Sequence, residues 1–244
     1  NEKNITWGWF SGGFTPSNKT ETGNAICESA HLNIAGKNIT DHVVHHEPFQ
    51  YYNSTANPHH LPPSSVNMIG KTDSANHQYD LTDFWKVANT NNLPAVSFIK
   101  APYYQTGHTK ASDPIDEQVF LVNTINKLQK IPLWNETAVI IAYDDTGGWY
   151  DHVMPSVIVH SSDPKYDALL GKNGLCGKSS INSYQDRCGY GGRLPLIIIS
   201  PLTKTNYVDH QITDQTSILK FIEDNWNLGR IGDKSFDKNA GSID

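Results

Sequence analysis

The chain has 244 residues, of which 37% are hydrophobic and 18% are charged, and its formal net charge is −6. This acidic balance leaves no basic surface to neutralise a phosphate backbone, which argues against nucleic acid as a partner. The longest apolar runs, at 138–142 and 194–199, are far shorter than the roughly 20 residues that span a bilayer, so no transmembrane segment is expected. The length suits one α/β domain over residues 1–244.

The first part of the chain, residues 1–92, is polar and irregular, with many Gly, Pro and Asn turn signals. Its aromatic side chains are too numerous to remain in water, so we expect these loops to pack over a core and to shape a cleft. Residues 80–89 predict a short helix within this region. The remaining residues, 93–244, predict the α/β core, beginning with a buried strand at 95–99.

Strands and helices alternate regularly along this core. Apolar residues at helical spacing predict a helix over 116–130, and Thr213 is expected to cap a second helix that ends near Trp226. Continuous apolar runs at 138–143 and 194–200 predict buried strands. The order of these elements predicts a mostly parallel sheet with helices on both faces.

The three cysteines bear on the cellular compartment. Cys176 and Cys188 lie in one loop rich in Gly, Ser and Asn, where a disulfide between them would indicate an oxidising environment. Cys27 is then either a free buried thiol or the partner of a cysteine elsewhere. Asn-X-Ser/Thr sequons give weak support for secretion, because a chain this rich in Asn, Ser and Thr produces several by chance. We expect a secreted or periplasmic protein.

The strongest signal for chemistry is the run DDTGGWYDH at 144–152, which directly follows the strand expected at 138–143. In open α/β sheets, ligands bind outside the carboxyl ends of the strands. Two adjacent carboxylates repel unless a cation or a shared proton relieves them, so the pair alone is explained by a hard metal ion or by a solvated loop cap, and the run as a whole favours the metal ion. The two glycines allow the backbone to approach a ligand closely. Asp151 and His152 add an acid and an imidazole near the same end of the strand.

Three histidines give the second signal. His59 and His60 lie between prolines, whose restricted φ angles fix the loop in one conformation. His108 follows a glycine shortly after the strand expected at 95–99, and so lies near the carboxyl end of that strand. A metal ion and several imidazoles around an anion suit phosphoryl transfer, in which positioning and charge stabilisation supply most of the catalysis.

Long motifs are spread over nearly the whole chain: NITWGWFSGGF, FQYYNSTANPHHLPPSS, NHQYDLTDF, LPAVSFIKAP, SDPIDEQ, VIIAYDDTGGWYDH, CGYGGRLPLIIISP and DQTSILKFIEDNWNLGRIGD. Together they closely resemble the bacterial and fungal phosphoesterases that include non-haemolytic phospholipases C and AcpA-type acid phosphatases. That family belongs to the alkaline-phosphatase superfamily. The resemblance implies a central mixed sheet flanked by helices and a phosphate monoester or phospholipid as substrate.

The resemblance also implies roles for individual residues. One or more divalent metal ions would be bound by Asp144 and Asp145, and His210 is either near the metal or structural. The phosphate pocket would be lined by His59, His60 and His108. Asp151 and His152 lie in a family motif and join these histidines as catalytic candidates.

The chain departs from the family in one respect. Family members carry a Glu-Asn-Arg-Ser-Phe-Asp-His type motif with metal ligands and a Gly-Gly-Ser segment with the nucleophilic hydroxyl, and neither occurs here. We therefore expect an N-terminal segment or chain to complete the active site and to supply the serine that becomes phosphorylated. Alone, the chain is expected to be inactive or nearly so. The alternatives are a non-catalytic binding or assembly module and a sulfatase- or nucleotide-pyrophosphatase-like enzyme on the same fold.

Overall fold

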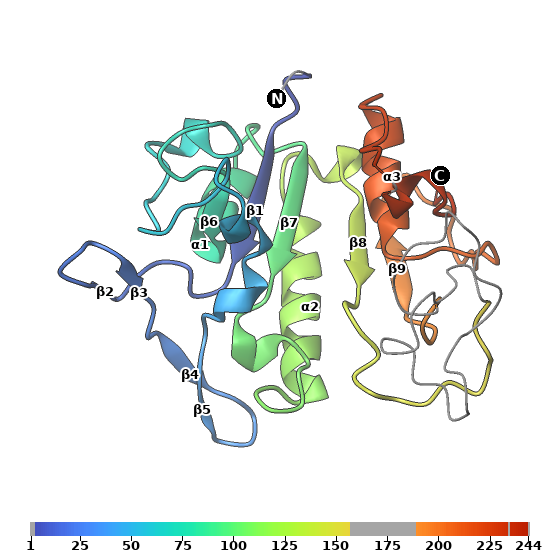
Figure 1. The fold of residues 1–244 in the computed structure, drawn as a ribbon, viewed down its shortest axis with the longest axis horizontal. Helices are drawn as coiled ribbons and strands as arrows, with labels where there is room; N and C mark the ends of the chain where they lie inside the picture. The colour runs from blue at the N-terminus through green and yellow to red at the C-terminus, as the bar shows by residue number, and fades with distance from the viewer. Residues whose placement is uncertain (1–2, 157–188, 234, 244) are drawn as a thin grey trace. The chain divides into compact units, whose positions relative to one another are not determined.

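A computed structural model describes residues 3–156, 189–233 and 235–243 of the protein (Figure 1). The chain forms two compact units. The first consists of Asn1–Val139 with Ser200–Leu202, and the second of Ile140–Ile199 with Thr203–Asp244. The organisation of residues 1–244 as a single domain stays a prediction.

The first unit is built on a parallel three-stranded sheet. Strand β1 (Trp7–Ser11) lies in the centre, with β6 (Gln78–Asp80) on one side and β7 (Val96–Lys100) on the other. The strand expected at 95–99 is therefore confirmed as β7. Sequence analysis missed β1 and β6, because β1 contains a glycine among aromatic residues and β6 has only three residues.

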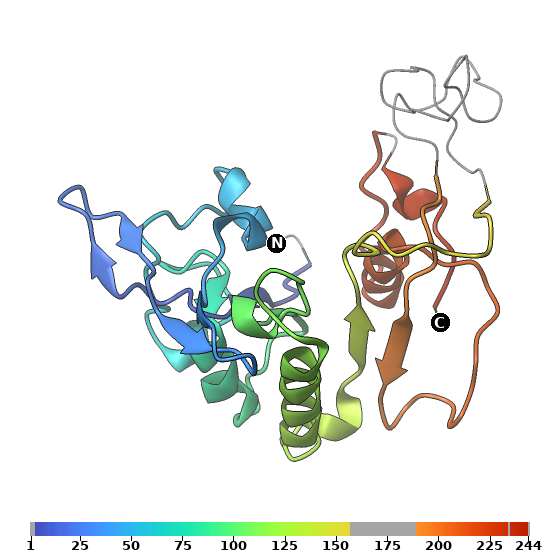
Figure 2. The ribbon, with the colours of Figure 1, turned by 90° about the horizontal axis from the view of Figure 1, so that it is seen from below.

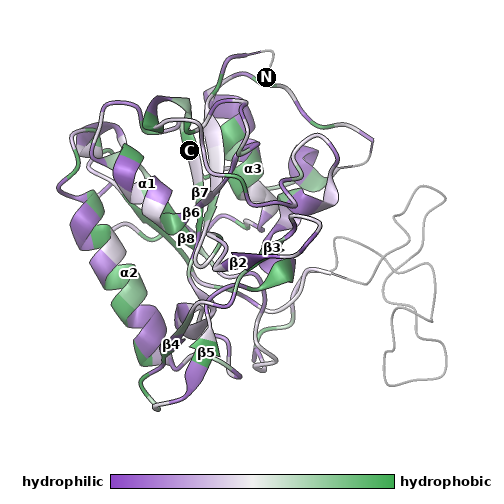
Figure 3. Ribbon diagram, turned by 90° about the vertical axis from the view of Figure 1, so that its left-hand side faces the viewer, coloured by the Kyte–Doolittle hydropathy of each residue, from purple (hydrophilic) through white to green (hydrophobic). Residues whose placement is uncertain are grey.

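Two helices follow the outer strands of this sheet. Helix α1 (Leu81–Ala88) begins directly after β6, where the Asp80 carboxylate accepts a hydrogen bond from the Thr82 amide. Helix α2 (Pro114–Leu128) starts with a capping box formed by Asp113 and Asp116. Both helices were expected from the sequence, and Figure 3 shows that each carries hydrophilic as well as hydrophobic residues.

The helices cover one face of the sheet. Phe10 of β1 and Tyr79 of β6 are buried in a core with Phe84 and Val87 of α1 and Leu128 of α2. Because side chains alternate along a strand, the neighbouring residues of β1 point to the opposite face.

Aromatic rings cover that opposite face. There the Trp9 ring lies 5.8 Å from the rings of Phe98 and Phe49, the latter on the 3₁₀ segment η2 (Pro48–Tyr51). A loop segment therefore packs over this face, as the aromatic content of residues 1–92 predicts.

The rest of the first unit is loop-rich, in agreement with the expected irregular N-terminal region. It holds two small antiparallel hairpins, β2–β3 and β4–β5, and several single 3₁₀ turns. The strands are β2 (Asn18–Lys19), β3 (Ala25–Ile26), β4 (Ala30–Leu32) and β5 (Asn38–Thr40). The other 3₁₀ turns are η1 (Val44–His46), η3 (Val66–Met68), η4 (Tyr103–Gln105) and η5 (Trp134–Glu136).

The second unit is smaller and contains the strand that precedes the acid run. Strand β8 (Val139–Ala142) pairs with β9 (Leu196–Ile199), as Figure 2 shows, and α3 (Thr216–Asn225) and η6 (Phe236–Lys238) complete the unit. Both strands and the helix were expected. The helix starts later than expected, because the Asp214 carboxylate, not Thr213, binds the Thr216 amide.

Together these elements confirm an α/β fold with parallel strand pairing. None of the helices in the described part of the chain is long and apolar enough to cross a membrane.

Candidate active site

The carboxyl ends of the three parallel strands meet at one edge of the first unit's sheet. Strand β1 ends at Ser11, and the chain then turns through Gly13, which has a φ of +76°. A Cβ atom at Gly13 would lie 2.6 Å from Cβ of Asp41, so only glycine fits this turn. The Thr15 amide then donates to the Asp80 carboxylate at the end of β6, at 3.0 Å. The loop after β1 is thereby fixed across the sheet edge.

A pocket of about 230 Å³ opens at this edge. Its wall includes His60, Asp80, Asp83 and Lys19, with the Phe14 ring among its apolar parts. The pocket therefore carries both signs of charge. Its volume is below the roughly 300–1,000 Å³ of sites for drug-sized ligands, so it suits a small polar group.

His60 is held firmly in the wall of this pocket. Its ring stacks on Phe14 with centroids 3.9 Å apart, and its Nδ1 donates to the Phe14 carbonyl at 2.7 Å. Since a carbonyl can only accept, Nδ1 carries the proton and Nε2 is left as an acceptor. Burial lowers the pKa of His60, so the imidazole is neutral near pH 7.

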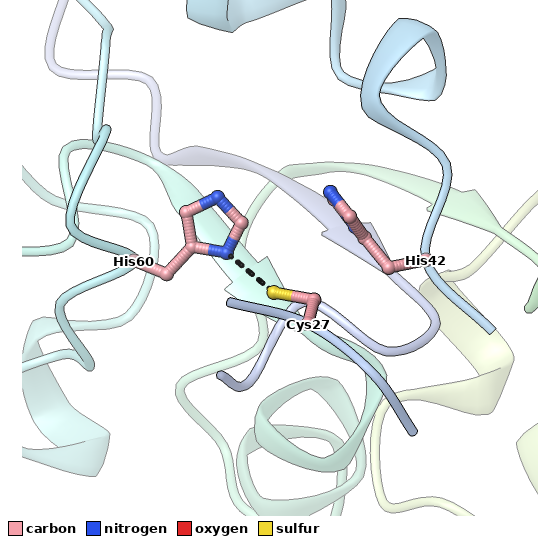
Figure 4. Close-up of side chains that lie close together, drawn as sticks. All are labelled: Cys27, His42 and His60. Atoms are coloured by element: carbon pink, nitrogen blue, oxygen red, sulfur yellow. Dashed lines mark hydrogen bonds between the residues drawn. The ribbon is translucent and has the colours of Figure 1, made fainter. Parts of the chain in front are cut away.

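Two further side chains approach His60, as Figure 4 shows. The Sγ atom of Cys27 lies 3.4 Å from His60 Nδ1. One possible metal-ligand atom from each of Cys27, His42 and His60 can be chosen so that all three atoms lie within 4.8 Å of one another. Burial raises the pKa of Cys27 to about 11, with the carboxylates of Glu47 and Asp80 adding to the effect. Burial also lowers the pKa of His42 to about 4, helped by the nearby His60. The cluster is therefore uncharged at neutral pH.

Glu47 lies behind His42 and is only 1% exposed. Its Oε1 lies 3.9 Å from His42 Nδ1, and among the described residues neither of its carboxylate oxygens has a hydrogen bond of good geometry. Burial raises the pKa of Glu47 to about 8, although the nearby Ser11 and Trp9 side chains oppose the shift. A carboxyl group that is protonated near neutral pH thus lies beside the cluster.

Sequence reasoning did not single out His42 or Glu47, and left Cys27 open. No spacing motif joins these residues, which come from different loops, so only the fold brings them together. Cys27 is a free thiol, which agrees with one of the two expected alternatives. The proposed Cys176–Cys188 disulfide lies outside the described residues.

Of the three histidines expected to line a phosphate pocket, only His60 lines the pocket described above. Nδ1 of His59 bonds to the Gly23 carbonyl at 2.8 Å, and His59 is not among the residues that line the pocket. His108 is exposed, and its Nδ1 accepts a hydrogen bond from the Lys110 amide at 3.2 Å. A common phosphate site for these histidines stays a prediction.

The acid run follows β8 in the second unit, at the expected position. The Asp145 carboxylate accepts a hydrogen bond from the Gly147 amide and closes a tight turn. The backbone carbonyls of Tyr143 and Asp144 accept from Nε2 of Gln215, at 2.8 and 2.7 Å. Because Gln215 directly precedes α3, these bonds tie the start of the run to the start of that helix.

The later residues of the run are arranged differently. Arg193 binds both carboxylate oxygens of Asp151, whereas the His152 ring contacts the ring of Tyr150 at 5.3 Å. Trp149 and Tyr150 are 84% and 83% exposed. His210, the third expected metal ligand, is exposed on a loop before α3.

The donor chemistry of Asp144 and Asp145 fits a hard cation, since both offer carboxylate oxygens. Within the described part of the second unit, however, no three His, Cys, Asp or Glu side chains lie close enough together to hold an ion. A cation at the acid pair would therefore need further ligands.

The sequence matches the Phosphoesterase family over residues 1–229. It is 31% identical to "Non-hemolytic phospholipase C" of Pseudomonas aeruginosa over 145 residues, which cover 57% of this chain and 21% of that protein. It is 30% identical over 148 residues to "Phospholipase C B" of Mycobacterium tuberculosis, covering 57% of this chain and 26% of that protein.

A plant relative is similar to the same extent. "Non-specific phospholipase C3" of Arabidopsis thaliana is 29% identical over 141 residues, which cover 55% of this chain and 25% of that protein. The matched part of the chain thus spans 21–26% of the length of these relatives. Because the family match extends over nearly all of its residues, the chain belongs to the Phosphoesterase family.

Proposed function

We propose that this chain is part of a metal-dependent phosphoric ester hydrolase of the phospholipase C or acid phosphatase type. The observation that carries the proposal is the family match over residues 1–229, which includes both the sheet-edge pocket and the acid run. Relatives that are named phospholipases C support the same class of reaction.

The reaction would proceed in two steps through a covalent intermediate. A serine hydroxyl outside residues 1–244, from an N-terminal segment or chain, attacks phosphorus while the alcohol oxygen of the ester leaves with a proton. Water then attacks the phosphoserine, which releases phosphate or a phosphorylated headgroup and restores the serine. The residues proposed to contact the substrate from this chain are His59, His60, His108, Asp151 and His152.

His60 is the best defined of these groups. Because its Nδ1 donates to the Phe14 carbonyl, its Nε2 is free to accept a proton or a hydrogen bond from substrate. The stack on Phe14 holds the ring in one orientation, which favours a fixed position for the reacting group.

A divalent metal ion would be held by Asp144 and Asp145, with His210 as a third ligand and the remaining ligands from outside this chain. When bound, such an ion neutralises charge that develops on the phosphoryl oxygens. The Asp145–Gly147 turn and the bonds from Gln215 would hold the acid pair in place for this role.

The substrate would be a phosphate monoester or a phospholipid. A secreted or periplasmic location is supported by the sequons and by the pairing proposed for Cys176 and Cys188. The sequence leaves the choice between the two substrate classes open, so an experiment has to include both.

The test uses the full-length protein, with its N-terminal residues, freed of metal by a chelator. We expect release of phosphate from a phosphate monoester or of phosphocholine from phosphatidylcholine vesicles, no release while the chelator is present, and recovery on adding a divalent metal ion. A full-length protein that is folded but inactive on both substrates would favour the binding-module alternative. Activity that survives chelation would contradict the proposed metal.

A further inference from the structure

Cys27, His42 and His60 come from three separate loops of the first unit and converge beside the pocket (Figure 4). The His42 side chain is only 9% exposed, and its Nδ1 has no hydrogen-bond partner among the described residues. A buried polar atom without a partner is costly, typically by about 1–3 kcal/mol. This cost falls if a ligand on the other ring nitrogen draws His42 towards Glu47, because Nδ1 now lies 3.9 Å from Glu47 Oε1.

The chemistry of the three side chains indicates the kind of ligand. One thiol and two imidazoles are the groups with which proteins bind zinc and similar thiolate-preferring cations. Zinc bonds of about 2.3 Å to sulfur and about 2.0 Å to nitrogen place tetrahedral ligand atoms roughly 3.5 Å apart. The separations of at most 4.8 Å between the three ligand-type atoms are close to this arrangement, so a small inward movement would complete it.

We propose that Cys27, His42 and His60 bind one thiolate-preferring divalent cation, represented by Zn²⁺. The Cys27 thiol proton is released to solvent when the thiolate binds the ion. Three protein ligands leave the fourth tetrahedral position open to water or to a group in the adjoining pocket.

Both histidines would change partners on binding. Nδ1 of His60, which lies 3.4 Å from Cys27 Sγ, would exchange its hydrogen bond to the Phe14 carbonyl for the ion, and its proton would move to Nε2. If His42 binds the ion through Nε2, its Nδ1–H faces Glu47 Oε1, now 3.9 Å away, and a carboxylate–histidine–metal arrangement results. Binding would thus give a partner both to His42 and to the Glu47 carboxylate, which otherwise lacks one among the described residues.

This site differs in chemistry from the acid pair of the second unit. Carboxylates prefer hard cations, whereas a thiolate with imidazoles prefers Zn²⁺. His60 belongs both to this cluster and to the pocket wall, so an ion on its Nδ1 would leave Nε2 protonated and unable to accept a proton or a hydrogen bond from substrate. That consequence, inhibition by Zn²⁺, rests on the proposed function, but the binding itself does not.

The test measures binding directly with Co²⁺, which replaces Zn²⁺ and absorbs light. Metal-free, fully reduced full-length protein is titrated with Co²⁺, and a thiolate-to-cobalt charge-transfer band in the near ultraviolet, saturating at one equivalent, is expected. The band should be lost in Cys27→Ser, weakened in Glu47→Gln, and bleached by added Zn²⁺. If the folded full-length protein binds Co²⁺ in this way but hydrolyses neither phosphoester substrate, the result would count against the proposed function and not against this metal site.

Two control variants test whether the band depends on these particular side chains. A Cys176→Ser/Cys188→Ser double variant should keep the band, which excludes the other two thiols of this chain. His45→Ala, at an exposed histidine, should also keep it. Alkylation of the unmodified protein, read by mass spectrometry, covers the case that Cys27→Ser does not fold. Saturating Zn²⁺ should slow alkylation of Cys27 at least tenfold. A band that persists in Cys27→Ser, no band in folded wild-type protein, or equal alkylation with and without Zn²⁺ would each overturn the proposal.

Discussion

Arg193 binds Asp151 through both carboxylate oxygens, with Nε 2.9 Å from Oδ2 and Nη2 2.9 Å from Oδ1. The Arg193 amide also donates to Oδ2 at 2.8 Å, and the Val153 amide donates to Oδ1. Together these bonds hold the pKa of Asp151 well below its usual range. A carboxylate bound in this way is a poor proton donor or acceptor, so we expect Asp151 to orient groups at the proposed site and not to transfer a proton.

Arg193→Ala should therefore raise the pKa of Asp151 towards the usual aspartate value, because it removes the charged donor and both side-chain bonds. A pKa that is depressed in the folded state contributes stability above the unfolded pKa and loses it as the pH falls. The measurement is the carboxyl titration of Asp151 by NMR in wild type and variant. Arg193→Lys, which keeps the charge but not the paired geometry, should give an intermediate value. Identical titrations in all three proteins would contradict the pairing.

Glu47 should give the opposite dependence of stability on pH. Burial raises its pKa from 4.5 to about 8, so folding takes up a proton in this range and the stability contributed by this group decreases as the pH rises. The limiting slope is about 1.4 kcal/mol per pH unit. Glu47→Gln should remove this loss, so the variant should gain stability relative to wild type between pH 5 and about 8.

The measurement for Glu47 is urea unfolding at several pH values with a chelator present, so that no metal at the neighbouring His42 contributes. Comparison of the two proteins at each pH cancels the titration of His42, which is present in both. Parallel stability curves for wild type and Glu47→Gln would show that Glu47 is ionised in the folded protein.

The elements predicted well from the sequence are those with a clear local signal. The apolar runs that became β8 and β9, and the apolar residues at helical spacing over 116–130 that belong to α2, mark their elements without reference to the rest of the fold. Strand β1 has no such signal, because its ladder with β6 and β7 is formed by residues about 70 and 90 positions away. Tertiary pairing therefore decides the centre of this sheet.

The candidate site divides in the same way. The acid run could be found from the sequence, because adjacent carboxylates and glycines after an apolar run form one local pattern. The environment of His60 could not be predicted, since Cys27, Phe14 and His42 reach it from other loops. Burial creates the shifted pKa of Glu47, and burial depends on the whole fold.

The sheet core offers a matched pair of valines for testing the packing. Val87 of α1 is fully buried, whereas Val119 of α2 is 45% exposed. Val87→Ala should lower the free energy of unfolding by roughly 2 kcal/mol, since it leaves a cavity. Val119→Ala should change it by less than about 0.5 kcal/mol. Urea unfolding of both variants is the measurement, and equal losses would contradict the described packing of α1.

His60→Ala tests the contribution of the sheet-edge pocket to activity. Loss of the imidazole should lower kcat/KM of the full-length enzyme by on the order of 100-fold, because it removes an oriented acceptor from the pocket. His45→Ala, at an exposed histidine outside the pocket lining, should leave kcat/KM unchanged within about twofold. If His60→Ala and wild type have comparable kcat/KM, His60 and the pocket that it lines do not contribute to catalysis.

Asp144 and Asp145, which follow β8, are proposed above to contribute metal ligands to a phosphoesterase site. The most direct measurement is metal-dependent phosphoester hydrolysis by full-length Asp144→Asn and Asp145→Asn, each compared with Asp209→Asn. Asp209 closes a turn to the Gln211 amide much as Asp145 does to Gly147, but no second acid adjoins it. Either acid-pair variant should lose on the order of 100-fold or more in kcat/KM and require more metal for half-maximal rate, with Asp209→Asn near wild type. Undiminished activity and unchanged metal dependence in both acid-pair variants would contradict this role of Asp144 and Asp145.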